Sequence, residues 1–159
     1  MRATLALPFP AVYRRVQRFT LSSLLVSLHQ GAHIVVADEK PALLEMMVNS
    51  LRSDDHCVFQ AYDGMAALEL ALGLKTIDLL VTNTQMPGLS GPELIRHVRA
   101  RLPALPILYI QNQGQPPITK DLPPDVPTLR EPFTREELQE AVRTALSRGR
   151  SNPQAQGSL

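Results

Sequence analysis

The chain has 159 residues, with 16 Lys and Arg against 15 Asp and Glu, which gives a formal net charge of +1. Its length fits one domain, and 44% hydrophobic with 19% charged residues excludes a disordered chain and a strongly basic nucleic-acid binder. The single cysteine excludes an intrachain disulfide framework and favours a cytoplasmic location, and no apolar run reaches the length of a membrane span.

The N-terminal region differs in charge from the rest of the chain. Residues 1–33 contain four arginines and no acidic residue, so 12 basic and 15 acidic residues remain from position 34 onward. We expect residues 1–32 to be a basic extension, either flexible or an amphipathic helix that docks a partner or touches an anionic membrane surface. A targeting segment and a misassigned start codon are the alternatives.

From position 33 onward, short apolar runs alternate with helical patterns. In chain order, the sequence predicts a strand at 33–37, a helix from 41 to 51, a strand at 57–62, a helix from 64 to 73, a strand at 78–82, a helix from 90 to 102, strands at 106–110 and 128–130, and a helix from 134 to 146. Pro41 suits a first helical turn, and Thr134 with Glu137 forms a capping-box pattern.

Proline is concentrated between the last two predicted strands. Five of the 14 prolines lie there, namely Pro116, Pro117, Pro123, Pro124 and Pro127. A proline inside a helix costs about 3 kcal/mol. We therefore expect at most a short helical turn, around residues 118–122, between these strands.

The alternation of strands and helices predicts a parallel sheet with helices on both faces, because right-handed crossovers return the chain to the same edge. In such sheets ligands bind at the carboxyl ends of the strands, beside a topological switch point. The positions at these ends are residues 37–39, Asn83, Gln111 and Glu131.

At those strand ends the sequence resembles the receiver domain of two-component response regulators. The matching segments are IVVADEKP (34–41), AYDG (61–64), DLLVTNTQMPGLSGPEL (78–94), LPILYI (105–110) and EPFTREEL (131–138). The resemblance implies an α/β, flavodoxin-like (CheY-like) doubly wound sheet of five parallel strands in the order 2-1-3-4-5, with the fourth helix short or missing. It places the receiver domain at residues 33–147 and leaves a disordered tail at 148–159.

In this family, the resemblance implies, an aspartate of the third strand accepts a phosphoryl group, an acidic pair after the first strand holds Mg²⁺, and a hydroxyl after the fourth strand and a lysine after the fifth contact the phosphoryl oxygens. The corresponding positions here are Asn83 for the acceptor, Ala37 for the first acid of the pair, Gln111 for the hydroxyl, Glu131 for the lysine and Thr128 for a switching aromatic. The resemblance thus implies a receiver that is degenerate at its phosphorylation site.

Asp38 and Glu39 form the residual acidic pocket. We expect Asp38 to be a partly solvated acid that caps the helix beginning at Pro41, in preference to a weak Mg²⁺ ligand, because hard cations need several oxygen ligands. We expect Glu131 to pair with Arg130 or a surface lysine, while a carboxylate pair with Asp38 that raises one pKa is a further hypothesis. Asn83 is either a mimic of the phosphorylated aspartate or a degenerate position, and the sequence does not separate the two.

The sequence therefore predicts a non-enzymatic, phosphorylation-independent interaction module without a cofactor, whose partner is a histidine kinase, a phosphotransfer protein or an output protein. One alternative is a phosphoacceptor that uses Asp38 or Glu39 in a phosphorelay, and another is a dimerisation or localisation module. No nucleic-acid partner is expected. His56, His97 and Cys57 lack the spacing of metal ligands.

Overall fold

The computed structural model describes residues 31–116 and 120–150. The expected N-terminal extension lies outside these residues, except for its last two positions. So does the expected C-terminal tail from residue 151 onward. The last helix continues to Arg150, three residues beyond the domain boundary expected at 147.

One five-stranded sheet forms the centre of the described chain. Its strands are β1 (His33–Ala37), β2 (Cys57–Ala61), β3 (Leu79–Asn83), β4 (Ile107–Gln111) and β5 (Thr128–Arg130). All pairings are parallel and the spatial order is β2-β1-β3-β4-β5. This topology confirms the predicted fold class.

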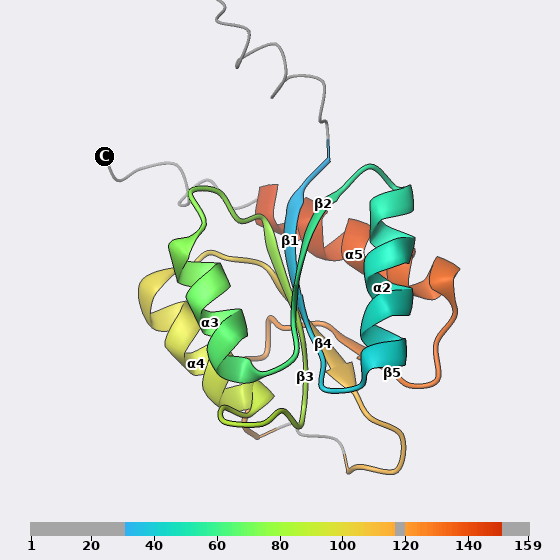
Figure 1. Ribbon diagram of the computed structural model, residues 1–159. Helices are drawn as coiled ribbons and strands as arrows, with labels where there is room; N and C mark the ends of the chain where they lie inside the picture. Colours follow the sequence, from blue (N-terminus) through green and yellow to red (C-terminus); the bar gives the residue numbers. More distant parts are fainter. Residues whose placement is uncertain (1–30, 117–119, 151–159) are drawn as a thin grey trace, which may run out of the picture. The chain divides into compact units, whose positions relative to one another are not determined.

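Two layers of helices cover the sheet. The helices are α2 (Pro41–Ser53), α3 (Gly64–Gly73), α4 (Gly91–Arg101) and α5 (Arg135–Arg150). Helices α2 and α5 pack on one face and α3 and α4 on the other, as right-handed crossovers on both sides of β1 require (Figure 1). No helix in the described part of the chain is long and apolar enough to cross a membrane.

Local signals fix where the helices begin. Pro41 occupies the first turn of α2. The Asp63 side chain accepts a hydrogen bond from the Ala66 amide at 2.7 Å at the start of α3. The capping box predicted for the last helix is confirmed, because the amide of Glu137 donates to Thr134 Oγ1 at 3.1 Å and the amide of Thr134 donates to Glu137 Oε2 at 2.7 Å.

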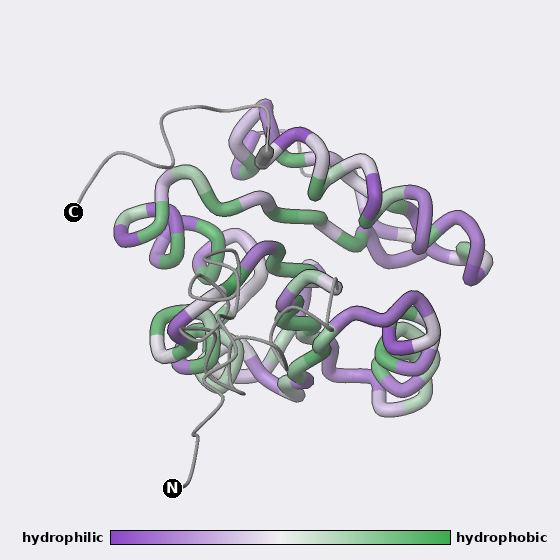
Figure 2. The backbone as a smooth tube through the Cα atoms, turned by 90° about the horizontal axis from the view of Figure 1, so that it is seen from above, coloured by the Kyte–Doolittle hydropathy of each residue, from purple (hydrophilic) through white to green (hydrophobic). Residues whose placement is uncertain are grey.

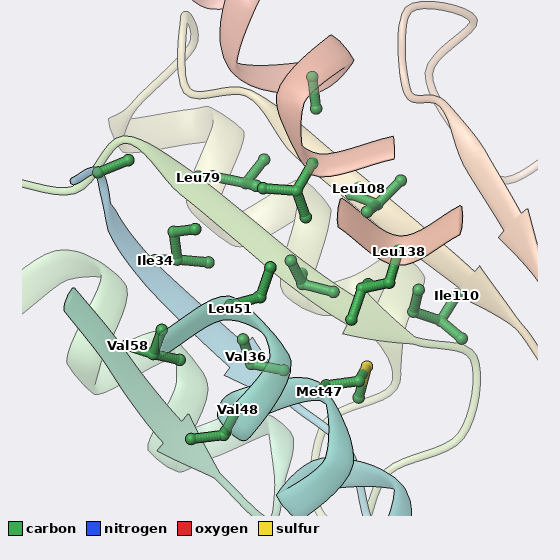
Figure 3. Packing of buried hydrophobic residues seen from close by; sticks show 14 of the residues in the cluster. Ile34, Val36, Met47, Val48, Leu51, Val58, Leu79, Leu108, Ile110 and Leu138 are labelled. Carbon is green, nitrogen blue, oxygen red and sulfur yellow. The ribbon is translucent and has the colours of Figure 1, made fainter. Parts of the chain in front are cut away.

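The sheet divides the buried side chains into two apolar clusters. One lies between the sheet and helices α2 and α5, where Ile34, Met47, Leu108 and Leu138 meet (Figure 3). The other lies beneath α3 and α4. Every residue of β3 and β4 is buried, as the continuous apolar runs predict, and Figure 2 shows mainly hydrophobic strands against helices of mixed polarity.

The segment between β4 and β5 is irregular. Its described residues, 112–116 and 120–127, form turns and bends without a helix, in agreement with the expected effect of the prolines. Part of the short turn expected at 118–122 lies outside the described residues. Four helices are nevertheless present in the described chain, and the fourth of them is α5.

Candidate functional site

The polar residues selected from the sequence meet at the carboxyl ends of β1, β3 and β4. Asp38 follows β1, Asn83 ends β3 and Gln111 ends β4, while Glu131 follows β5. Asp38 and Asn83 are fully buried and Gln111 is 6% exposed. The switch point of the sheet therefore carries a small cluster of buried polar side chains, the pocket named from the sequence.

Asp38 is held by two hydrogen-bond donors. Asn83 Nδ2 donates to Asp38 Oδ2 at 2.8 Å, and the backbone amide of Lys40 donates to Asp38 Oδ1 at 2.7 Å. The second bond spans two residues, so it closes a local turn instead of capping α2, whose N-cap residue is Lys40. The expectation of a partly solvated, helix-capping acid at Asp38 is therefore wrong.

The charge state of Asp38 reflects competing influences. Burial raises the pKa of the Asp38 carboxyl above its usual value, and this effect outweighs the hydrogen bonds from Lys40 and Asn83 and the positive charge of Lys40, all of which lower the pKa. The negative charge of Glu131 contributes a smaller upward effect. Desolvation is therefore the main cause of the raised pKa, and the predicted influence of Glu131 is present but minor.

The amide of Asn83 is only partly satisfied. Its nitrogen donates to Asp38, while Oδ1 is buried and has no hydrogen-bond partner among the described residues. The following loop is tightly packed, because a Cβ atom on Gly91 would lie 1.9 Å from the backbone oxygen of Asn83. Glycine is thus required at position 91 because the backbone of Asn83 lies too close for a side chain. Gly88 adopts a φ of 79°, which favours glycine.

Glu131 pairs with a lysine from the opposite side of the pocket. Lys40 Nζ lies 3.0 Å from Glu131 Oε2 and 3.4 Å from Oε1. The Glu131 side chain is 15% exposed and that of Lys40 is 46% exposed. A lysine partner was one of the two expected, and Arg130 is not the partner.

Arg130 instead contacts the residue at the end of β4. Its Nε donates to Gln111 Oε1 at 3.1 Å, and Gln111 Nε2 donates to the backbone oxygen of Gln115 at 3.1 Å. Both ends of the Gln111 side chain are therefore engaged. Thr128 is exposed and lies beside the buried Tyr109 in the register of β4 and β5.

The remaining candidates lie outside this network. Glu39 is exposed, and among residues 31–116 and 120–150 no hydrogen bond or ion pair joins it to the pocket. Ala37 is buried and offers no polar group. Within the same part of the chain, no group of three or more His, Cys, Asp and Glu side chains is arranged to hold a metal ion.

Sequence reasoning missed Lys40 as a member of the site. The signal was present, because Lys40 stands beside the acidic pair in the DEKP segment while a glutamate occupies position 131. A lysine after the first strand and a glutamate after the fifth strand lie at the same carboxyl end of the sheet, where opposite charges can form an ion pair. Asp38 and Glu131 alone would give the pocket a net charge of −2, and the positive charge of Lys40 reduces it to −1.

The chain is similar to signalling proteins from several bacteria. A family model described as the response regulator receiver domain matches residues 34–143. The sensor kinase CckA of Brucella abortus is 25% identical over 144 residues, covering 89% of this chain and 15% of its own length. The sensor protein EvgS of Escherichia coli K12 is 35% identical over 93 residues, covering 57% of this chain and 7% of its own length.

The solved structures agree with this similarity. The crystal structure of a response regulator receiver protein from Sinorhizobium medicae WSM419 matches with a TM-score of 0.69 at 27% identity, and the match covers 74% of this chain and 96% of that one. The chain thus matches nearly the whole of a receiver structure but only a small part of the curated relatives named above. Because the family model covers more than half of its residues, the chain belongs to the response regulator receiver domain family of two-component signalling.

Proposed function

We propose that this receiver domain acts without being phosphorylated and transmits signals as a protein-interaction module. The observation that carries the proposal is the position of Asn83, which stands where the family resemblance places the acceptor aspartate. Asn83 is buried and directs its amide nitrogen toward Asp38 at 2.8 Å. An amide is a poor nucleophile, and phosphorylation of its nitrogen would not give the acyl phosphate that receivers form.

The charge at the end of β5 supports the same proposal. Phosphoryl transfer depends on cations that neutralise the transferred group. A unit positive charge about 4 Å from a phosphoryl oxygen contributes about 4 kcal/mol at an effective dielectric constant of about 20, and a carboxylate there changes this attraction into a similar repulsion. Glu131 occupies the position of the family's lysine, and Lys40 is already engaged with it.

The loop after β4 also supports a fixed conformation. Receivers with a hydroxyl at position 111 contact the phosphoryl group there, as the resemblance implies. Gln111 is instead held at both ends of its side chain, by Arg130 and by the backbone of Gln115. We propose that the face formed by β4, β5 and α5 is presented to partners in one state.

The partner we propose is a protein of a two-component pathway. Receiver domains of this family interact with kinases and output domains. The matches include both sensor kinases and transcriptional regulatory proteins, such as CckA and GlrR. We therefore propose a histidine kinase, a phosphotransfer protein or an output protein as the partner.

Intact-mass spectrometry after incubation with a small acyl-phosphate donor and Mg²⁺ tests the proposal. We expect no phosphate adduct on the natural chain, and a hydroxylamine-labile adduct on the triple variant Asn83→Asp, Gln111→Thr, Glu131→Lys. An adduct on the natural chain that disappears in Asp38→Asn or Glu39→Gln would instead support the phosphorelay alternative. Any stable adduct on the natural chain would contradict the proposed function.

A further inference from the structure

The Lys40 ammonium pairs directly with the Glu131 carboxylate and acts through its charge on the Asp38 carboxylate. Lys40 Nζ contacts both oxygens of Glu131, at 3.0 and 3.4 Å. The positive charge of Lys40 also acts on Asp38, whose Oδ1 accepts a bond from the Lys40 amide. One side chain therefore compensates the acid that follows β1 and the acid that follows β5.

The same residues do not fit the Mg²⁺ ion that receiver domains use. Magnesium requires near-octahedral oxygen ligands and usually takes one or two free carboxylates. Each oxygen of Asp38 already accepts one N–H bond, which makes the carboxylate a weaker ligand, and Asn83 directs its nitrogen, not its oxygen, toward Asp38. Ala37 supplies no ligand, and Glu131 is engaged with Lys40.

We propose that Lys40 is a tethered counter-ion that takes the electrostatic place of the divalent cation in this pocket. This proposal rests on the proposed function, since both concern a pocket that no longer binds a phosphoryl group. A lysine charge belongs to the chain and is present at every magnesium concentration. The domain therefore keeps the β1–α2 and β5–α5 turns connected without a metal ion, and its conformation is independent of magnesium.

Removing the tethered charge should reveal a need for a cation. In Lys40→Met the aliphatic stem remains and Asp38 keeps its two N–H donors, but Glu131 becomes a free carboxylate of the kind that a hydrated Mg²⁺ takes. A cation held with a Kd of about 1 mM and supplied at about 10 mM raises the unfolding midpoint of a domain of this size by about 5 °C.

Thermal unfolding of the full chain, with and without about 10 mM MgCl₂ at constant ionic strength, tests the proposal. We expect the midpoint of the natural chain to move by less than about 1 °C. We expect Lys40→Met to unfold at a lower temperature and to regain about 5 °C with Mg²⁺. Lys40→Arg, which keeps the charge, and Lys75→Met, which removes an exposed lysine elsewhere, should not respond to Mg²⁺.

Two results would overturn the proposal. A clear Mg²⁺ response of the natural chain would show that the pocket still binds the metal. If Lys40→Met is as stable as the natural chain and its unfolding midpoint does not change with Mg²⁺, Lys40 forms only an ordinary surface ion pair with Glu131. Neither result concerns phosphorylation, so the mass-spectrometric test of the proposed function can fail or succeed independently.

Discussion

Replacing Asn83 with aspartate should place two carboxylates against each other inside the pocket. In the natural chain, Asn83 Nδ2 donates to Asp38 Oδ2 at 2.8 Å, and both residues are fully buried. The substitution changes the donor into a second acceptor of nearly the same size. The variant therefore alters charge and hydrogen bonding with little change in packing.

The expected cost is large for a single substitution. Two carboxylate charges about 4 Å apart repel by about 4 kcal/mol at an effective dielectric constant of about 20. The lost bond to a charged group contributes about 1.5–3 kcal/mol. Protonation of one carboxyl relieves part of this, so we expect Asn83→Asp to lower the free energy of unfolding at pH 7 by about 3–5 kcal/mol.

The sign of the pH dependence follows from where the proton is bound. The folded variant holds a proton more tightly than the unfolded chain, in which an aspartate has a pKa near 3.9. The folded state is therefore favoured below that pKa, and stability is lost as pH rises through the higher pKa of the buried pair. Because burial also raises the pKa of Asp38 in the natural chain, the natural chain should show the same trend more weakly.

Urea unfolding at pH 4.5 and pH 7, with and without Mg²⁺, measures these effects. We expect the deficit of Asn83→Asp to be present at pH 7, to shrink at pH 4.5 and to shrink when a divalent cation is added. Asn49→Asp makes the same chemical change on the exposed face of α2 and should stay within about 0.5 kcal/mol of the natural chain. Equal stability of Asn83→Asp and the natural chain at pH 7 without divalent ions would refute the reasoning.

Three further predictions concern packing and pH. Gly91→Ala should lower the free energy of unfolding by about 3 kcal/mol or more in urea titrations, because its Cβ would lie 1.9 Å from the backbone oxygen of Asn83. Gly73→Ala is the control, because no atom lies within 4 Å of its Cβ, and it should be neutral or slightly stabilising. Leu138→Ala should cost about 2–5 kcal/mol in the same measurement, because the side chain is fully buried; a loss below about 1 kcal/mol would contradict this. Burial lowers the pKa of His56 below 6.5, so the unfolded chain binds more protons than the folded chain, and stability should fall as the pH drops below about 6.5. Thermal unfolding between about pH 5 and 7.5 should show a smaller decrease of the unfolding midpoint in His56→Gln than in the natural chain.

The sheet and the position of the pocket could be predicted because both follow from periodicity and topology. Strand ends in a parallel sheet meet at one edge, so the proximity of Asp38 and Asn83 follows from their places after the first strand and at the end of the third. Their hydrogen bond at 2.8 Å is a consequence of that topology. The residue types at these positions then gave the family resemblance.

The particular partners of Glu131 and Arg130 were harder to predict, because residues adjacent in the sequence need not contact each other in space. Successive side chains along an extended strand point to opposite faces. Arg130 accordingly donates to Gln111, while Glu131 meets Lys40, which is 91 positions away in the sequence. Sequence spacing alone does not reveal a contact between a long surface lysine and a distant turn.

The burial of Asp38 could not be predicted from its neighbours in the sequence either. A carboxylate at a strand end is usually solvated, and a helix beginning at Pro41 suggested a capping role. The chain instead folds back after β1, so that the Lys40 amide closes a turn on Asp38 and Asn83 covers its other oxygen. Burial of this kind depends on the surrounding loops, which periodicity does not describe.

The shortness of β5 has a consequence for self-association. An edge strand exposes unpaired N–H and C=O groups, and a long, flat edge can recruit a strand from another chain and begin aggregation. β5 has three residues, and the exposed Arg130 is followed by Glu131 and by Pro132, which has no N–H to donate. Too few backbone groups are available there to extend the sheet. Glu131 and Pro132 therefore protect this edge of the sheet from pairing with another chain, although no helix lies between β4 and β5 among the described residues.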